Sequence, residues 1–332
     1  MKIKKSYGFI SILATILFIF MSVLKVEAFE LPNLNDLKEV KSEETFNREA
    51  SLNTISEPIE FTSNIDYITF QKNRIETLYN QVYHSLNRHN NEIEFINSET
   101  GEIMDIVEAL GGGSIITPRS LIAVDATTSP FNSTAQINSY YFMPNNQVKV
   151  SYGSGFYTGG KNVSTAGHVI YNPKNGGFPT YSSVAFGRRG PNTYSWYVES
   201  NSFSTIQAYI NNPTISMADI GKIKNINMAA TNVPARSMRY ETDSSSTHKV
   251  TNFGYPGTHF LQYATDGTAK MLFDNSQQNG MFKSTNIRSL AGMSGGPLNK
   301  DGKIIGLLSG GNDTVDYFVP MYPAYMDFFK TN

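Results

Sequence analysis

From about residue 114 onward, the chain is a succession of short apolar or alternating segments separated by turn-forming residues. Segments such as "VKVSYGSGFYT", "SSVAFG", "KVTNFGYPG" and "KIIGLL" are divided by clusters of Gly, Pro, Asn and Ser. Strands of this length and spacing are typical of antiparallel all-β folds, either a barrel or a sandwich. Within this region only the end shows a helical pattern, with Tyr322, Tyr325, Met326 and Phe329 at i, i+3, i+4 and i+7. The sequence therefore predicts an all-β body with a C-terminal helix.

The segment 29–113 has a different character and an opposite charge. It carries 16 Asp and Glu against 6 Lys and Arg, whereas 114–332 carries 11 against 17. Its apolar residues Ile75, Leu78, Val82 and Leu86 recur at helical spacing, and we expect Asp66 to cap this helix. The segment is either a solvated acidic leader or a pro-segment matched in charge to the basic body.

Three glycines, Gly111, Gly112 and Gly113, close the acidic segment. Such a run favours an open, protease-accessible segment and a domain boundary. The basic residues beyond it are scattered along the chain, which argues against a nucleic-acid partner.

The first 28 residues resemble a secretory signal. Three lysines precede an apolar run from about Gly8 to Leu24, and Val26, Glu27 and Ala28 offer a cleavage site after Ala28. The alternative is an uncleaved membrane anchor, because the run approaches a spanning length. The chain has no cysteine, which excludes thiolate metal sites and cysteine nucleophiles and suits a secreted exoprotein of the Gram-positive type. We expect no membrane contact after signal cleavage.

The motif "GMSGGPL", residues 292–298, places one serine, Ser294, between glycines. Glycines allow a tight turn and leave backbone N–H groups open, as a nucleophile beside an oxyanion hole requires. The alternative is a plain Gly-Ser turn between strands. The α/β-hydrolase arrangement is excluded because its histidine follows the serine, and no histidine follows Ser294.

A general base must then lie upstream of the serine. His248 and His259 lie in polar or turn segments, whereas His168 follows "STAG", where an apolar strand ends and leads into a loop. Among the aspartates between His168 and Ser294, Asp219 stands at the start of an apolar strand, where burial is expected; the others, in loops or turns, are Asp243, Asp266 and Asp274. The order His168, Asp219, Ser294 is that of the chymotrypsin-like arrangement.

The blocks "VSTAGHVIYN", "ADIGKIK", "NFGYPG" and "GMSGGPL", in this order, resemble the chymotrypsin-fold serine peptidases of the bacterial glutamyl endopeptidase family. The resemblance covers about residues 114–330. It implies two six-stranded antiparallel β-barrels, with a boundary at roughly 225–245, in a peptidase domain 114–332 behind a signal peptide 1–28 and a pro-segment 29–113. Gly221 and Lys222 depart from the aliphatic residues that the family usually has there.

The resemblance also implies the role of each residue. Ser294 attacks the scissile carbonyl, His168 transfers the proton, Asp219 holds the imidazole, and the N–H groups of Gly292 and Ser294 form the oxyanion hole. Substrate would contact a further set of residues: Arg288, Ser289, Leu308, Ser309, Gly310 and Gly311.

The position that carries a carboxylate-binding histidine in family members that cleave after Glu is Leu308 here. Arg288 could supply a replacement positive charge, or it could be an exposed loop arginine. Ser309 could hydrogen-bond near Asp219, and Gly310 and Gly311 match the segment that pairs with substrate backbone as an added strand.

The sequence thus predicts a secreted, monomeric serine endopeptidase made as a precursor, with peptide or protein substrates and an activating protease as partners and no cofactor or metal. A secreted toxin or binding protein on a peptidase fold, with little turnover, is an alternative. A surface adhesin is a weaker one, because the chain has no repeat or anchoring motif.

Overall fold

The computed structural model describes residues 37–42, 64–83, 93–111, 121–144, 146–190, 193–214, 216–226, 228, 232–257, 259–273 and 280–331. All of these belong to one unit, Leu34–Asn332. The expected signal peptide, Leu86, and the segment after Gly111 up to residue 120 lie outside the described residues. Within the described residues, no helix is both long and apolar enough to span a membrane.

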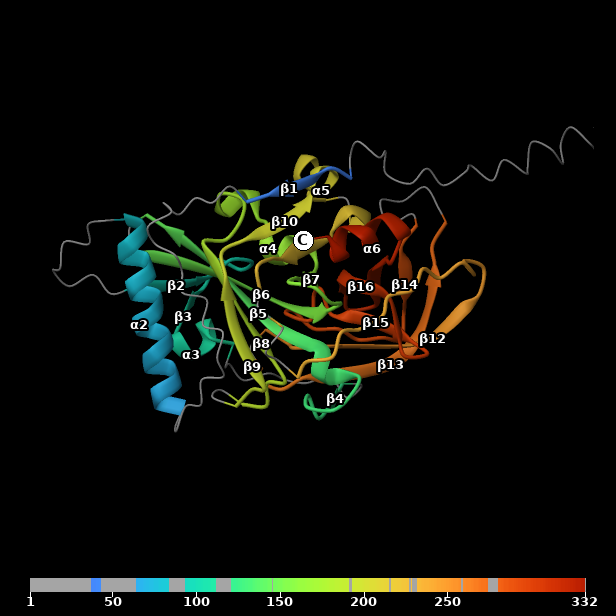
Figure 1. Ribbon diagram of the computed structural model, residues 1–332, viewed down its shortest axis with the longest axis horizontal. Helices are drawn as coiled ribbons and strands as arrows, with labels where there is room; N and C mark the ends of the chain where they lie inside the picture. The colour runs from blue at the N-terminus through green and yellow to red at the C-terminus, as the bar shows by residue number, and fades with distance from the viewer. Residues whose placement is uncertain are drawn as a thin grey trace, which may run out of the picture. The chain divides into compact units, whose positions relative to one another are not determined.

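Two mainly antiparallel sheets carry most of the described chain (Figure 1). The first has the strand order β1-β10-β11-β7-β6-β5-β8-β9, with β2 added beside β6 and β3 beside β2. Its strands are β1 (Glu39–Lys41), β2 (Glu94–Asn97), β3 (Ile103–Met104), β5 (Thr134–Met143), β6 (Gln147–Tyr157), β7 (Val163–Thr165), β8 (Tyr181–Phe186), β9 (Trp196–Ser200), β10 (Phe203–Ile206) and β11 (Gly221–Ile223).

The second sheet closes on itself. Its order is β12-β15-β16-β17-β14-β13, with β13 paired back to β12 and β4 attached outside the ring. The strands are β4 (Ile122–Ala123), β12 (Thr247–Gly254), β13 (Tyr263–Met271), β14 (Phe282–Ser284), β15 (Pro297–Lys300), β16 (Lys303–Asn312) and β17 (Val315–Pro320). This six-stranded barrel confirms the predicted all-β fold.

The first sheet is larger than the expected six strands. Among the described residues it has ten: seven come from the body, β1 and β2 come from the acidic segment and pair with β10 and β6, and β3, also from the acidic segment, pairs with β2. β1 pairs with β10 through Glu39 opposite Ile206, and β2 runs parallel to β6 with Phe95 opposite Val148. The acidic segment is thus part of the same hydrogen-bonded sheet.

The helices are short except for one: α2 (Asn64–Tyr83), α3 (Ile106–Ala109), α4 (Gly167–Ile170), α5 (Gln207–Asn211) and α6 (Pro323–Lys330), with 3₁₀ turns at Phe131–Ser133, Pro173–Asn175 and Ser216–Ala218. The expected capping role of Asp66 is wrong, because α2 already begins at Asn64 and Asp66 lies in its first turn. A carboxylate there still interacts favourably with the helix dipole. The C-terminal helix is confirmed as α6.

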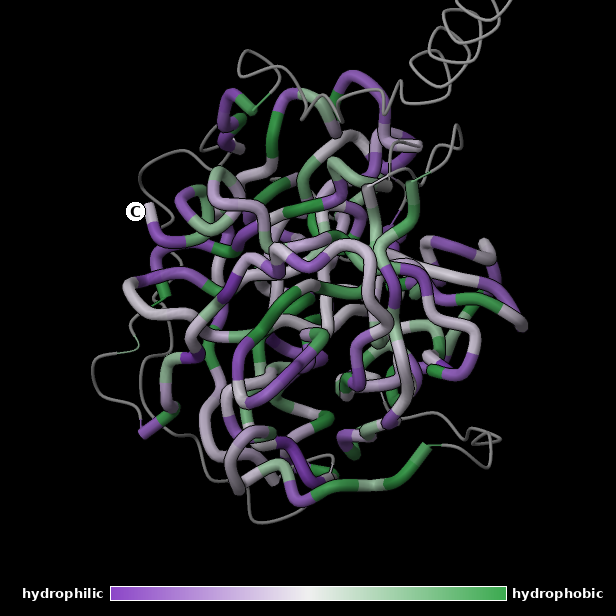
Figure 2. Tube along the Cα trace, turned by 90° about the vertical axis from the view of Figure 1, so that its right-hand side faces the viewer, coloured by the Kyte–Doolittle hydropathy of each residue, from purple (hydrophilic) through white to green (hydrophobic). Residues whose placement is uncertain are grey.

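Two apolar cores lie against the two sheets. One core is shared by α2, β2, α3 and the first sheet; its buried members are Tyr67, Ile75, Leu78, Tyr79, Phe95, Ala109, Leu110, Tyr140, Phe142, Val148, Val150, Tyr152 and Tyr181. The other fills the barrel and includes Met271, Phe282, Leu298, Ile305 and Phe318. Figure 2 shows hydrophobic stretches as short pieces alternating with hydrophilic ones, as expected for strands with two unlike faces.

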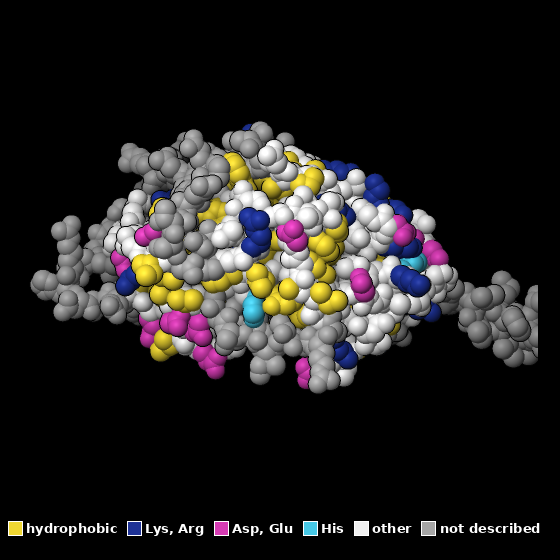
Figure 3. All heavy atoms as spheres, turned by 90° about the horizontal axis from the view of Figure 1, so that it is seen from below, with side chains coloured by type: hydrophobic (Ala, Val, Ile, Leu, Met, Phe, Trp, Pro, Cys, Tyr) yellow, Lys and Arg dark blue, Asp and Glu magenta, His cyan; other side chains and the backbone are white. Residues whose placement is uncertain are grey.

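The acidic residues remain segregated in the folded unit. In Figure 3, acidic side chains gather at the left, the side on which Figure 1 shows α2, β2 and β3, while most of the visible Lys and Arg lie toward the other end. Gly111, expected in an open segment, is buried beside the Gln136 side chain.

Packing of α2 into the first core predicts a large cost for one substitution. Ile75 is 0% exposed and Ile65, on the same helix, is 75% exposed. We expect Ile75→Ala to lower the free energy of unfolding by about 2–4 kcal/mol, because it leaves a cavity. Ile65→Ala should change it by less than about 0.5 kcal/mol. Urea unfolding of the full chain measures both; equal small effects would contradict the assignment of α2 to the core.

Candidate active site

Two neighbouring strands bring His168 and Asp219 together. β7 and β11 pair antiparallel, with Thr165 opposite Gly221. The chain leaving β7 and the chain entering β11 therefore lie at the same end of the sheet. His168 follows β7 within the single turn of α4, not in a loop as expected, and Asp219 precedes β11 by two residues.

The Asp219 carboxylate is buried, at 3% exposure, and accepts three hydrogen bonds. Its Oδ1 accepts from the backbone N–H of His168 at 2.8 Å, and its Oδ2 lies 2.8 Å from His168 Nδ1. Ser309 Oγ donates to the same Oδ2 at 2.6 Å. Together these contacts fix both the position and the plane of the imidazole.

The geometry defines the tautomer of His168. A carboxylate can only accept, so the proton of the neutral ring is on Nδ1 and Nε2 is left as an acceptor. The side chain is 30% exposed. Burial lowers the pKa of His168, but the charge and hydrogen bond of Asp219 and the charge of Glu99 outweigh burial and raise it above its ordinary value.

Close packing explains two features of the sequence around this pair. A Cβ at Gly167 would meet the Tyr209 ring and Asp219 Oδ1, so a side chain there would push the carboxylate away. In β16, the pairing with β17 shifts between Leu308 and Gly310 and leaves Ser309 unpaired. Such a bulge re-aims a side chain, here the Ser309 hydroxyl toward Asp219.

The "GMSGGPL" loop is held tightly against both sheets. Gly292 and Gly295 have φ of +89° and +81°, which glycine adopts without strain. A Cβ at Gly292 would overlap Gly257, one at Gly295 would overlap Ser154 O, and one at Gly296 would overlap Phe253 O. Glycine at all three positions is thus a packing requirement.

The backbone of this loop offers two open donors. The N–H groups of Met293, Gly295 and Gly296 donate to Leu290 O, Leu308 O and Met293 O. Within the described part of the chain, the N–H groups of Gly292 and Ser294 have no protein acceptor. Two unpaired N–H groups beside a serine form a site for a negatively charged oxygen.

A cavity of about 640 Å³ collects the residues singled out in the sequence. It is lined by His168, Ser294 and all six expected substrate-contacting residues: Arg288, Ser289, Leu308, Ser309, Gly310 and Gly311. Among the described residues, Ser294 Oγ makes no hydrogen bond to His168. In unliganded sites this contact is commonly long and shortens with substrate.

Arg288 and Ser289 differ in what they offer to a ligand. Arg288 Nη1 is buried and has no hydrogen-bond partner among the described residues. Ser289, by contrast, donates its hydroxyl and its backbone N–H to the carboxyl group of Asp316, the latter at 3.2 Å. Of these two side chains, Arg288 is therefore the one that offers a free donor.

Asp316 and Glu99 are among the cavity residues that escaped sequence reasoning. Asp316 lies on β17 and is 3% exposed; burial raises its pKa, against the hydrogen bonds from Ser289 and the charge of Arg288. The sequence did contain a signal for Asp316, because a single carboxyl side chain in an otherwise apolar strand indicates a special site. Glu99 lies in the turn between β2 and β3 and lines the cavity with His168. Nothing local marks Glu99, because its place depends on how the acidic segment folds against the body.

Among the described residues, no three His, Asp or Glu side chains lie together in a way that could hold a metal ion. The chemistry that the cavity supports is acyl transfer at Ser294, with His168 as base and Asp219 as its orienting partner.

Residues 153–307 match the family of the trypsin-like peptidase domain. Among solved structures, a Glu endopeptidase in complex with MPD is 21% identical to this chain, with a TM-score of 0.51, over 65% of this chain and 97% of that one. Protease Anisep from Arthrobacter nicotinovorans is 16% identical, with a TM-score of 0.49, over 60% and 94%. No curated protein matches the chain. The likeness to the Glu endopeptidase structure shows the chymotrypsin-like fold.

The contacts of His168 predict an ordered series of pKa values. We expect an NMR titration of the full chain to place the pKa of His168 above the ordinary histidine value. Asp219→Asn should lower it most, because both a charge and a strong hydrogen bond are weakened, and Glu99→Gln should lower it less. His259, whose pKa burial lowers, is the internal control and should not move. A His168 pKa that does not respond to Asp219→Asn would contradict the pairing.

Proposed function

We propose that this chain is a serine endopeptidase, secreted as a precursor, that hydrolyses peptide bonds through an acyl-enzyme. One observation carries the proposal. Ser294 shares a cavity with His168, whose Nδ1 is held by buried Asp219, and the two unpaired N–H groups of Gly292 and Ser294 flank the hydroxyl.

Each group then has a defined task in the proposed reaction. Ser294 Oγ attacks the scissile carbonyl carbon while its proton passes to His168 Nε2, and the developing oxyanion accepts from the two free N–H groups, worth about 3 kcal/mol each. The imidazolium, stabilised by Asp219, protonates the leaving amine. Water then repeats the sequence on the acyl-enzyme and releases the acid product.

We further propose a preference for Glu or Asp on the acyl side of the cleaved bond. The support is the buried, unpartnered Nη1 of Arg288 at the cavity. A buried carboxylate needs such a partner, because desolvating it alone costs several kcal/mol. Leu308 offers no donor, and the Ser289 hydroxyl is already bound to Asp316.

The precursor part of the proposal rests on residues 1–28 and on the acidic segment that follows them. Signal cleavage after Ala28 would release the chain, and a second protease would cut between Gly111 and the start of the body. Since Gly111 is buried, we place the second cut within residues 112–120.

Ser294→Ala in the otherwise intact protein should abolish casein hydrolysis and labelling by a fluorophosphonate probe, because it removes the hydroxyl that lies beside the two open N–H donors of Gly292 and Ser294. His168→Ala should be as severe, and the double variant no worse, because members of one catalytic unit do not add. Ser245→Ala, in an exposed turn, is the matched control. Activity in Ser294→Ala would contradict the assignment.

A wild-type protein that binds peptides, but neither hydrolyses them nor reacts with the fluorophosphonate probe, would support the alternative of a binding protein.

Arg288→Leu should lower kcat/KM for peptides with Glu at the cleaved position about 100-fold, because it removes the cation that pairs with the carboxylate. Cleavage of otherwise identical peptides with Gln should change little. Arg189→Leu, on an exposed loop, controls for lost surface charge. A wild-type preference for Leu, Phe or Met that Arg288→Leu leaves unchanged would show an apolar pocket instead.

A further inference from the structure

The acidic segment is bonded into the body at several places far apart in the sequence. Residues of α2, β2 and α3 make up about half of the first core, alongside Tyr140, Val150 and Tyr181 of the first sheet. Tyr79 OH donates to Met143 O at 2.6 Å and accepts from the N–H of Asn146 at 2.8 Å. Dissociation of the segment would expose a continuous apolar face of a kind that soluble proteins rarely leave open.

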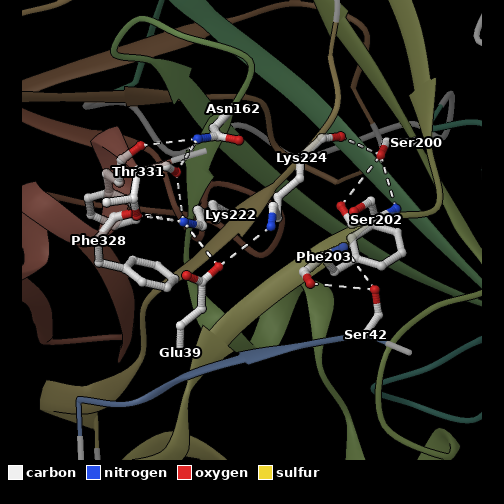
Figure 4. A network of polar contacts seen from close by, with 11 residues as sticks. Glu39, Ser42, Asn162, Ser200, Ser202, Phe203, Lys222, Lys224, Phe328 and Thr331 are labelled. Carbon is white, nitrogen blue, oxygen red and sulfur yellow. Dashed lines mark hydrogen bonds and ion pairs between the residues drawn. The ribbon is translucent and has the colours of Figure 1, made fainter. Parts of the chain in front are cut away.

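Two fully buried charges of the body have their counter-charges on the acidic segment. Glu199 on β9 has a side chain 0% exposed and accepts from Arg74 Nε at 3.0 Å and Nη2 at 2.9 Å. Lys222 on β11, also 0% exposed, lies 3.2 Å from Glu39 Oε1. In Figure 4, Glu39 reaches from β1 toward Lys222 and Lys224 beside Phe328 and Thr331. Without the segment, both charges would lose these partners.

Buried Arg188 is likewise shared with the acidic segment. Its guanidinium lies over the rings of Tyr67, at 5.3 Å, and Phe260, at 4.1 Å. It donates to Tyr67 OH at 3.0 Å and to Leu110 O at 3.4 Å. Burial raises the pKa of Tyr67, against the Arg188 charge, so the phenol stays neutral as an acceptor for the arginine.

The segment also braces the loop that carries the nucleophile. Tyr152 on β6 donates its hydroxyl to Glu108 O at 2.6 Å, and its ring lies against Gly257. Gly257 N–H in turn donates to Ala291 O at 2.7 Å, directly before Gly292. The turn at Glu99 lines the cavity itself. The acidic segment thus reaches both the back and the mouth of the proposed active site.

We propose that residues 39–111 stay bound to the body after the chain is cut within residues 112–120, so that the working protein is a two-chain complex with Glu99 in its cleft wall. The interaction surface lies on β5, β6, β8 and β9 together with β10 and β11, and its occupant is the chain's own acidic segment. The role of Glu99 in catalysis rests on the proposed function; retention of the segment does not.

The test uses the full chain with a recognition site for an unrelated protease inserted after residue 115. After complete cutting, both fragments should co-elute in size-exclusion chromatography and appear as one species in native mass spectrometry, and should separate in urea. A freed acidic fragment beside a folded body under native conditions would overturn the proposal. This readout needs no activity, so it separates failure of the proposal from failure of the proposed function.

A matched pair of variants tests the buried ion pair. Arg74→Met should speed dissociation of the cut complex at least about tenfold, since Glu199 loses its counter-charge. Lys72→Met, two residues away in an exposed pair with Glu76 at 4.0 Å, should leave it unchanged. If Arg74→Met does not fold, Arg74→Met with Glu199→Gln removes the buried charge and should restore folding while dissociation stays fast. Equal dissociation of the Arg74 and Lys72 variants would contradict this anchoring.

Glu99→Gln provides a readout at the cleft. In an NMR titration it should lower the pKa of His168 by the same amount before and after cutting, because the turn stays beside His168. A shift seen only before cutting would show that the segment leaves, and would overturn the proposal.

Discussion

The position of Ser294 relative to His168 depends on one buried serine, Ser154 of β6. Its N–H donates to Ser294 O at 2.7 Å and its Oγ donates to Gly292 O at 2.9 Å, while Oγ accepts from the N–H of Tyr255 at 2.8 Å. Its carbonyl accepts from Thr165 Oγ1 at 2.7 Å, at the end of the strand that leads to His168. One residue thus joins the two sheets at the point where Ser294 and His168 line a common cavity.

The acidic segment adds strands to the first sheet and also supplies partners for buried charges of the body. The body buries Glu199, Arg188 and Lys222, and each of them takes a partner from α2, α3 or β1. Because separating a buried ion pair leaves a desolvated charge behind, the fold of the body and the placement of the segment depend on one another. The charge asymmetry seen along the chain becomes a set of specific buried contacts and an acidic outer end.

The cavity and its immediate surroundings contain two groups of charged side chains. Asp219 and Glu99 both favour the protonated form of His168. Arg288 and Asp316 both line the cavity, and Ser289 is hydrogen-bonded to Asp316. In the proposed mechanism the first group would affect proton transfer and the second would affect which substrate side chain is bound, so substitutions in the two groups should have different kinetic effects.

Local patterns in the sequence determined the strand-rich body, the helix at Pro323–Lys330 and the identity of the residues at the cavity, because alternation, turn residues and the glycines around Ser294 are short-range signals. They did not determine the first turn of α2, the helical turn at His168, the burial of Gly111, or the places of Glu99 and Asp316. These depend on the approach of segments distant in the chain: β2 beside β6, Gln136 beside Gly111, Asp316 beside Ser289. Only tertiary structure decides such contacts, because the desolvation that makes them strong exists only once the two sheets have closed.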